Sequence, residues 1–126
     1  MAKTESIELQ MAEILDSVSK DVKGVYETDS KQVAKETAQM LKNTSPKGSP
    51  HKRKYAEGWK VSKQRGGDLV VHNATNYQLT HLLENGHRIV NKKGEFGRVN
   101  GIKHIAPAEE WASEELPRRI MEDLDL

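Results

Sequence analysis

Residues 73–87, Asn73-Ala-Thr-Asn-Tyr-Gln-Leu-Thr-His-Leu-Leu-Glu-Asn-Gly-His87, contain the signals for the start, body and end of a short helix. Thr75 and Gln78 have the spacing of a capping box, in which each side chain bonds the other residue's backbone amide. Gly86 suits the left-handed residue that commonly ends a helix. Four apolar residues between these signals fall near helical spacing: Tyr77, Leu79, Leu82 and Leu83. The pattern predicts a central helix of about three turns.

Two short strands are predicted before this helix, at residues 55–61 and 69–71. Gly66 and Gly67 lie between them and can adopt the positive φ angles of a hairpin turn. Strict alternation places one set of side chains on the face that the N-terminal helix should cover: Tyr55, Trp59 and Val61. Val71 is the expected core residue of the second strand.

Residues 4–43 read as helix, either as two helices or as one bent helix. Both forms stay open because Gly24 weakens the continuity and residues 28–30 offer a second N-cap. The apolar stripe of this region consists of Ile7, Met11, Ile14, Leu15, Val18, Val22 and Val25. We expect the stripe to pack against a sheet or against a neighbouring subunit.

Residues 43–51 contain two prolines and a glycine, which predict a loop. Three basic residues follow at once: Lys52, Arg53 and Lys54. They can belong to a solvated loop or contact phosphate or an acidic protein surface. Residues 88–101 are basic and punctuated by glycine, which predicts a hairpin-like arm or a loop that becomes ordered against a partner.

A C-terminal helix is predicted over residues 107–124, with Pro107 in its first turn and a kink or break at Pro117. Trp111 on this helix is an expected core residue. The predicted fold class is α+β in a single domain over residues 1–126. A long N-terminal helix packs on a small antiparallel β-sheet, and the sheet, central helix and arm occupy residues 54–105.

The composition indicates a sparse core, since 35% of the 126 residues are hydrophobic, 5% are aromatic, and the mean hydropathy is -0.79. Long solvated loops, or apolar surface that is buried only on assembly, would account for these values. A net charge of +1 gives no general electrostatic argument for nucleic acid or membrane binding. No apolar run approaches the roughly 20 residues of a membrane helix, and the N-terminus lacks a signal peptide's apolar core. We therefore expect a protein made in the cytoplasm.

Four side chains could in principle hold zinc: His81, Glu84, His87 and His104. This pattern is weak, because the His-Glu-x-x-His motif is absent, His87 lies beyond the helix-ending Gly86, and the chain has no cysteine. The competing interpretation is that His81 and His104 form hydrogen bonds within the fold while Glu84 pairs with a basic residue. No phosphate-binding loop or hydrolytic triad is recognisable, so we expect neither an enzyme nor a cofactor.

Three blocks of sequence carry a family resemblance: residues 44–59 with Thr44-Ser-Pro46 and Tyr55-Ala-Glu-Gly-Trp59, residues 73–87, and His104-Ile-Ala-Pro107-Ala. Together they resemble the gene-product-ten-like tail components of long-tailed bacteriophages, of the HK-ninety-seven type, over residues 30–115. The resemblance implies a virion structural protein at the head–tail junction, made in the host cytoplasm. Such a neck, head-closure or tail-completion subunit works as a ring-shaped homo-oligomer. Its implied neighbours are head-closure or portal-adaptor proteins and tail-tube or terminator proteins, with no membrane and with DNA only passing through the lumen.

The charges suggest how subunits of such a ring could meet. Segments 42–65 and 88–103 are basic, whereas the C-terminal helix is acidic, so a head-to-tail contact is possible. The expected polar contacts are Lys52, Arg53, Lys54, Lys92, Lys93 and Arg98, with Glu109 and Glu110 of a neighbour. Apolar contacts from Ile89, Val90 and Phe96 should supply the affinity.

Two other functions remain open on the sequence alone. The alternative is a small nucleic-acid-binding module that uses the basic loop 47–65 and the arm 88–103. The third is a histidine-dependent metallo-enzyme such as a nuclease.

Overall fold

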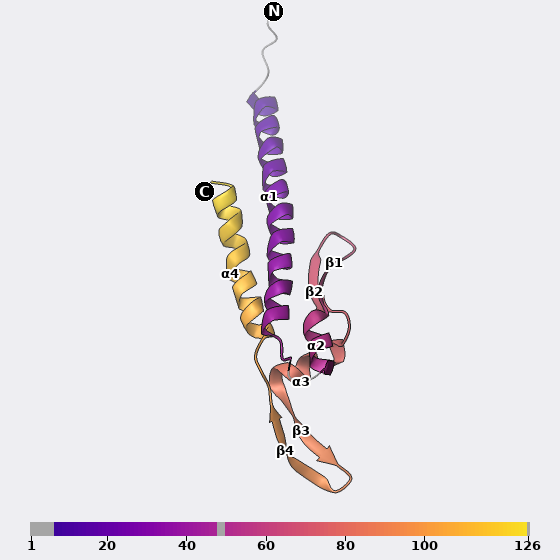
Figure 1. The fold of residues 1–126 in the computed structure, drawn as a ribbon. Helices are drawn as coiled ribbons and strands as arrows, with labels where there is room; N and C mark the ends of the chain where they lie inside the picture. The colour runs from indigo at the N-terminus through magenta and orange to yellow at the C-terminus, as the bar shows by residue number, and fades with distance from the viewer. Residues whose placement is uncertain (1–6, 48–49, 126) are drawn as a thin grey trace, which may run out of the picture.

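The structure, a computed structural model, describes residues 7–47 and 50–125. In chain order these residues form α1 (Ile7–Thr44), α2 (Pro50–Glu57), β1 (Trp59–Lys63), β2 (Leu69–Asn73), the 3-10 turn η1 (Tyr77–Leu79), α3 (Thr80–Asn85), β3 (Gly86–Asn91), β4 (Gly94–Asn100) and α4 (Ile105–Asp123). Figure 1 shows α4 alongside the C-terminal half of α1, and the β3–β4 hairpin projecting from the opposite end of the molecule. The fold class is α+β, as predicted.

The strands form two separate antiparallel pairs, β1–β2 and β3–β4, and not the single small sheet that we expected. The β1–β2 pair packs on α1, whereas β3–β4 makes its substantial contacts within itself and with α3. The glycine-punctuated arm is therefore a hairpin whose two strands, β3 and β4, bond each other. Neither strand pairs with β1 or β2.

α1 is one continuous helix of 38 residues, which decides between the two forms left open by the sequence. A single exposed glycine costs a helix only about 1 kcal/mol, so Gly24 does not interrupt it. The C-terminal half is packed, with Val33 and Leu41 buried. The N-terminal half lies beyond the reach of α4 and β1–β2 (Figure 1). Packing of the apolar stripe on a sheet is therefore wrong, because most of its residues are exposed: Met11, Ile14, Leu15, Val18 and Val22.

Tyr55 lies on helix α2 and not on a strand. Residues 52–57 are mostly good helix formers, and Pro50 suits the first turn, so the helix begins inside the predicted loop. It ends at Gly58, whose N–H bonds the Tyr55 carbonyl at 3.1 Å. A Cβ on Gly58 would lie 2.1 Å from the Thr75 hydroxyl oxygen, so the close approach requires glycine. The predicted strand alternation of Tyr55 with Trp59 is therefore wrong, although both side chains are buried.

The β1–β2 hairpin has the predicted turn, with Gly66 at φ +100° and Gly67 at φ +96°. Trp59 pairs with Asn73 across the strands, and Val61 pairs with Val71. Trp59 is only 4% exposed, and Val71 packs against the same core. Val61 is 36% exposed, so its predicted core position is wrong.

The predicted capping box of Thr75 and Gln78 is absent. The Asn73 side chain takes the capping role, and its Oδ1 accepts hydrogen bonds from the backbone N–H groups of Thr75 (3.3 Å) and Asn76 (2.8 Å). This is the Asx turn, in which a short amide side chain replaces a backbone acceptor. The Thr75 hydroxyl donates to the Lys54 carbonyl at 3.0 Å. The hydroxyl therefore joins this segment to α2.

The central helix is divided into η1 and the six-residue α3, and the division rotates the apolar face. A 3-10 turn advances 120° per residue, so residues beyond it leave the α-helical phase. Leu79 and Leu83 pack against the core, whereas Tyr77 is 67% exposed and Leu82 is 43% exposed. The core positions predicted for Tyr77 and Leu82 are therefore wrong. Gly86 ends the helix as predicted, at φ +80°, with its N–H bonded to the Leu82 carbonyl.

α4 begins at Ile105, two residues before the predicted start, and Pro107 lies in its first turn. The helix runs through Pro117 to Asp123, so of the predicted kink or break, the break is wrong. Pro117 has no N–H, so the Ser113 carbonyl loses its helical partner. Ser113 is exposed, so this carbonyl can be hydrated. Trp111 is half-buried.

The core lies where α1, α2, β1 and α4 meet. Its buried residues are Ala38, Leu41, Tyr55, Trp59 and Ala108, and Met40, Val71, Leu79, Leu83 and Ile105 pack around them. No helix in the described ranges combines the length and apolar character that crossing a membrane requires.

Candidate functional site

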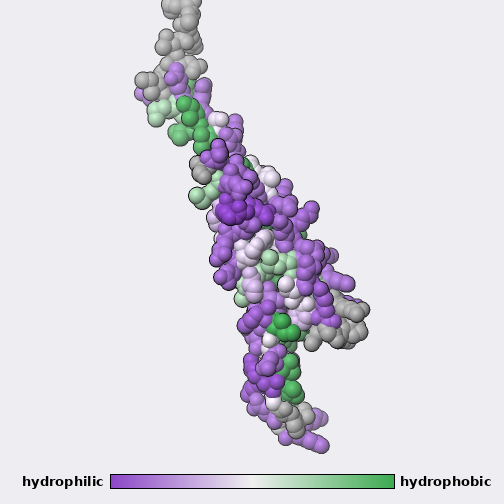
Figure 2. Space-filling model, turned by 60° about the vertical axis from the view of Figure 1, so that its left-hand side comes forward, coloured by the Kyte–Doolittle hydropathy of each residue, from purple (hydrophilic) through white to green (hydrophobic). Residues whose placement is uncertain are grey.

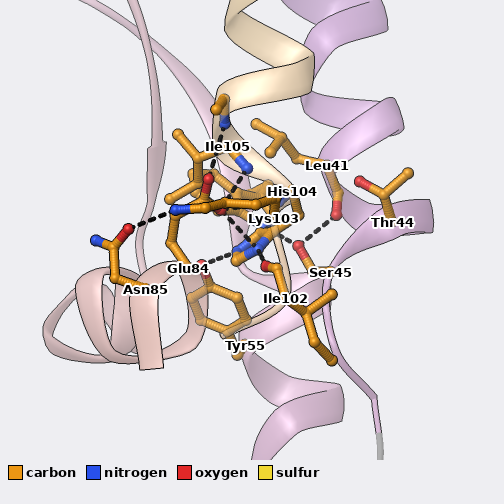
Figure 3. A network of polar contacts seen from close by, with 12 residues as sticks. Leu41, Thr44, Ser45, Tyr55, Glu84, Asn85, Ile102, Lys103, His104 and Ile105 are labelled. Carbon is orange, nitrogen blue, oxygen red and sulfur yellow. Dashed lines mark hydrogen bonds and ion pairs between the residues drawn. The ribbon is translucent and has the colours of Figure 1, made fainter. Parts of the chain in front are cut away.

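A buried aromatic cluster joins α2, β1 and the start of α4. The rings of Tyr55, Trp59 and His104 meet edge to face, with centroid distances of 5.6, 5.6 and 6.4 Å. Trp59 Nε1 donates to the Ser45 hydroxyl at 2.8 Å, and that hydroxyl donates to the Leu41 carbonyl. Figure 3 shows Ser45 and Leu41 beside Tyr55, His104 and Glu84. The cluster therefore fixes the end of α1 against the rest of the core.

Glu84 links α3 to the first turn of α4. Its Oε1 accepts hydrogen bonds from the backbone N–H groups of His104 and Ile105, both at 2.8 Å, and its Oε2 accepts one from Ala106 at 3.1 Å. These N–H groups have no partner inside the helix, so the carboxylate caps α4. Burial by itself raises the pKa of Glu84, but the three N–H donors and the nearby His104 outweigh it and hold the pKa below its ordinary value.

The His104 side chain has a partner for each ring nitrogen. Nδ1 lies 2.6 Å from the Ile102 carbonyl and 3.0 Å from Glu84 Oε1, so it carries the proton and donates it. Nε2 then accepts from the Tyr55 hydroxyl at 2.7 Å. Burial, followed by the charge of Glu84, raises the pKa of Tyr55, which keeps the hydroxyl protonated as this bond requires.

This polar network has no access to a substrate. Tyr55 is 0% exposed and His104 is 1% exposed, and Glu84 is occupied by backbone amides. General acid–base chemistry needs the proton-transferring group within hydrogen-bond reach of the reactant. The role of the network is therefore structural.

The four side chains considered for zinc do not come together. Glu84 and His104 are adjacent, but His81 is exposed on α3 and His87 is exposed on β3. In the part of the chain that the structure describes, no group of three or more His, Asp or Glu side chains could hold a metal ion. The competing interpretation is confirmed for His104, which forms hydrogen bonds within the fold. Glu84 pairs with His104 and with backbone amides, and not with a lysine or arginine.

Most of the described residues predicted for subunit contacts lie on two separate surfaces. The first surface is the arm, defined as the β3–β4 hairpin, on which the apolar side chains of Ile89, Val90 and Val99 are 42%, 61% and 41% exposed. The basic residues Lys92, Lys93 and Arg98 are also exposed on the arm. The second surface is the acidic side of α4, with Glu109 and Glu110 exposed. Lys54 is exposed on α2, and the side chains of Lys52, Arg53 and Phe96 lie outside the described residues.

The root of the arm is tightly fixed, although the arm itself projects. Ile102 N–H donates to the Leu83 carbonyl at 2.8 Å. A Cβ on Gly101 would lie 2.3 Å from the Glu84 carbonyl oxygen, and one on Gly86 would lie 2.2 Å from that of Val99. Because the two glycines let the backbones cross this closely, the arm leaves the body in a defined direction.

Three structurally important groups were missed in the sequence. Asn73 caps the central segment, and the spacing Asn73-x-Thr75-Asn76 is a signal for an Asx turn that could have identified it. Ser45 bonds Trp59, but no local pattern connects them. Asp29 is only 6% exposed on α1, and its Oδ2 has no hydrogen-bond partner.

One comparison with known proteins confirms the family resemblance. The family model described as "Bacteriophage HK97-gp10, putative tail-component" matches residues 10–86. The matched segment includes most of α1, the β1–β2 hairpin and the capped segment around Asn73. No curated protein and no solved structure gives a significant match. The chain belongs to the HK97-gp10-like family of bacteriophage tail components.

Proposed function

We propose that the protein is a ring-forming adaptor at the head–tail junction of a long-tailed bacteriophage, and that it acts there as a neck, head-closure or tail-completion subunit. Membership of the tail-component family supports a place in the virion. The observation that carries the proposal is the arm, which projects from a fixed root and exposes apolar side chains.

The arm is built for contact with another protein. Ile89 and Val90 are exposed next to basic side chains, and apolar anchors with a charged rim are typical of protein interfaces. An isolated two-stranded hairpin is at best marginally stable in water. Docking on a neighbour would therefore bury its apolar residues and stabilise its pairing.

The acidic side of α4 is the complementary surface in our proposal. Glu109 and Glu110 are exposed near the start of α4, close to the root of the arm along the chain. A contact between the arm of one subunit and α4 of the next is heterologous, and such contacts generate rings when the rotation closes. The subunit would meet copies of itself in the ring, and head-closure, portal-adaptor, tail-tube or terminator proteins above and below. DNA would only pass through the lumen.

Shortening the arm tests the proposal. Residues 89–97 are replaced by an Asn-Gly turn, which preserves the pairing of Arg88 with Arg98 at the root. We expect a folded protein with an unchanged thermal midpoint that fails to join heads to tails in a phage complementation assay. Electron microscopy should then show separate heads and tails.

A matched pair of point variants separates the contribution of the apolar contact from that of the surrounding charges. Val90→Asp should reduce the number of joined particles at least tenfold, because it places a charge in the apolar contact. Lys92→Ala, at an exposed rim position of the same hairpin, should change it less than threefold. Normal joining by the shortened-arm protein would refute the role of the arm.

A further inference from the structure

The N-terminal half of α1 carries a long apolar surface that the described chain leaves open. Figure 1 shows this half of the helix projecting past the end of α4, and Figure 2 shows hydrophobic side chains gathered there. The α1 stripe is defined here as Met11, Ile14, Leu15, Val18, Val22, Val25 and Tyr26. Six of these side chains are 41–65% exposed, and Val25 is half-buried. A surface of this kind usually marks an interaction site.

The α1 stripe continues the line along which α4 packs on α1. α4 contacts this line through Arg119, which pairs with Glu36, and through Asp123 at its end, which faces Asp29. Residues three or four positions apart along a helix lie on one face, so Val25, Val22 and Val18 extend the same row beyond Asp29. The helix–helix contact therefore stops where α4 ends, whereas the apolar row continues.

The spacing within the α1 stripe favours another helix as the occupant. Met11 and Val22 are eleven positions apart, as are Ile14 and Val25, and Leu15 and Tyr26. An eleven-residue repeat keeps apolar side chains on one face of a helix that coils slightly to the right. Such a row is suited to a long partner helix.

We propose that two copies of the chain pair through their α1 stripes, antiparallel and centred on Val18. Five of the seven stripe residues are balanced about Val18: Ile14 and Val22 lie four positions on either side of it, and Met11 and Val25 lie seven. Leu15 and Tyr26 have Asp21 and Gln10 at the matching positions, so the apolar contact is centred on the other five. Antiparallel pairing then brings Met11 level with Val25 of the second copy. This contact is isologous, and it does not use the arm.

The position of the folded body and the charge pattern both favour the antiparallel direction. Antiparallel helices place the two bodies at opposite ends, whereas parallel helices would place them side by side (Figure 1). The first half of the exposed segment is acidic, through Glu8, Glu13 and Asp16, while the second half carries Lys20 and Lys23 against Asp21. Parallel pairing would bring the two acidic halves side by side, and antiparallel pairing brings each beside the half that carries the lysines. Glu13 lies on the outer side of the pair, so this charge effect acts at long range and does not form the contact.

Cysteine pairs can test this geometry directly, because the natural chain has no cysteine. Under mild oxidation of the full chain, Val18→Cys should give a covalent dimer, since the two sulfurs meet at the symmetry axis. Met11→Cys alone should not cross-link, but the double variant Met11→Cys with Val25→Cys should. Glu13→Cys, on the opposite side of the helix, is the control for random collisions.

Several outcomes would overturn the proposal. Cross-linking of Met11→Cys alone would indicate parallel pairing, and cross-linking of Val18→Cys no better than that of Glu13→Cys would exclude the stripe as the contact. Light scattering provides a second measurement: the natural chain should have twice the mass of Val18→Asp, which should dimerise at least tenfold more weakly. Val18 is 51% exposed, so the substitution should leave the circular dichroism of the body unchanged. A monomeric natural chain at all concentrations would also refute the pairing.

Discussion

Glu84 caps α4 from twenty positions upstream, with its Oε1 2.8 Å from the backbone nitrogen of His104. The whole arm lies between these two residues in the chain. The bond therefore closes the root of the arm and starts the C-terminal helix with the same carboxylate.

Replacing Glu84 should destabilise the protein more than its position on a short helix suggests. Glu84→Ala leaves three backbone N–H groups at the start of α4 without their acceptor, and we expect a loss of about 2–4 kcal/mol in unfolding free energy. Glu84→Gln keeps one acceptor oxygen and should lose about half as much. Urea denaturation measures both, with Glu110→Ala as the exposed control. Equal stability of Glu84→Ala and the natural chain would contradict the capping role.

The same carboxylate should make stability depend on pH. The pKa of Glu84 is held below its ordinary value of 4.5 in the folded protein, so near and below this pH the unfolded chain binds more protons. The contribution of Glu84 is fully present above 4.5 and is lost as the pH falls through the folded pKa. As the pH falls from about 5 to about 3, the unfolding free energy of Glu84→Gln should decline less steeply than that of the natural chain. Parallel curves would show that other carboxylates cause the decline.

Tyr55→Phe should remove the proton that the hydroxyl donates to His104 Nε2. The nitrogen would then be buried without a donor, which costs about 1–3 kcal/mol, although the ring packing is preserved. Tyr77→Phe is the matched control, because Tyr77 is 67% exposed. Thermal and urea unfolding should separate the two variants. If both were neutral, the hydrogen bond would contribute nothing to stability.

Asp29→Asn should stabilise the protein at neutral pH. Burial, and then the facing carboxyl of Asp123, raise the pKa of Asp29 above its ordinary value of 3.8, an effect that Arg119 reduces. Above the pKa that Asp29 has in the folded protein, its ionised carboxylate destabilises the fold. The unfolding free energy therefore rises as the pH falls through that pKa. The advantage of Asp29→Asn should therefore shrink in acid. Thermal unfolding at pH 7 and pH 4 tests this, and Asp21→Asn at an exposed site of the same helix should be neutral at both.

Several turn and helix-end signals that span only a few residues predicted the structure correctly. The glycines at 66 and 67 form the hairpin turn, Gly86 ends α3, and Pro107 lies in the first turn of α4. The errors occur where two structures compete for the same residues, either locally or through a distant segment. Thr75 could have capped Gln78, but the Asn73 side chain takes the capping role, and the Thr75 hydroxyl is turned to donate to the Lys54 carbonyl.

The sequence indicated the surfaces proposed for subunit contacts more readily than the buried polar network around Glu84 and His104. Runs of basic and acidic residues are visible in the sequence, and the structure places Val90 and Glu109 on the surface. The contacts of Glu84 with His104 and of Trp59 with Ser45 join separate elements. Such pairs follow from the packing of the chain, so local spacing cannot reveal them.

Leu82 and Leu83 provide a direct test of how the 3-10 turn sets the phase of α3. Leu83 packs against the core, so Leu83→Ala should cost about 1–3 kcal/mol by leaving a cavity. Leu82 is 43% exposed, and Leu82→Ala should change stability by less than about 0.5 kcal/mol. Both substitutions change helix propensity by the same amount, so their difference in urea unfolding measures burial alone. A larger loss of unfolding free energy for Leu82→Ala than for Leu83→Ala would contradict this arrangement. It would mean that the central segment is a regular α-helix from its first residue, with Leu82 on the buried face as the apolar spacing of the sequence predicts.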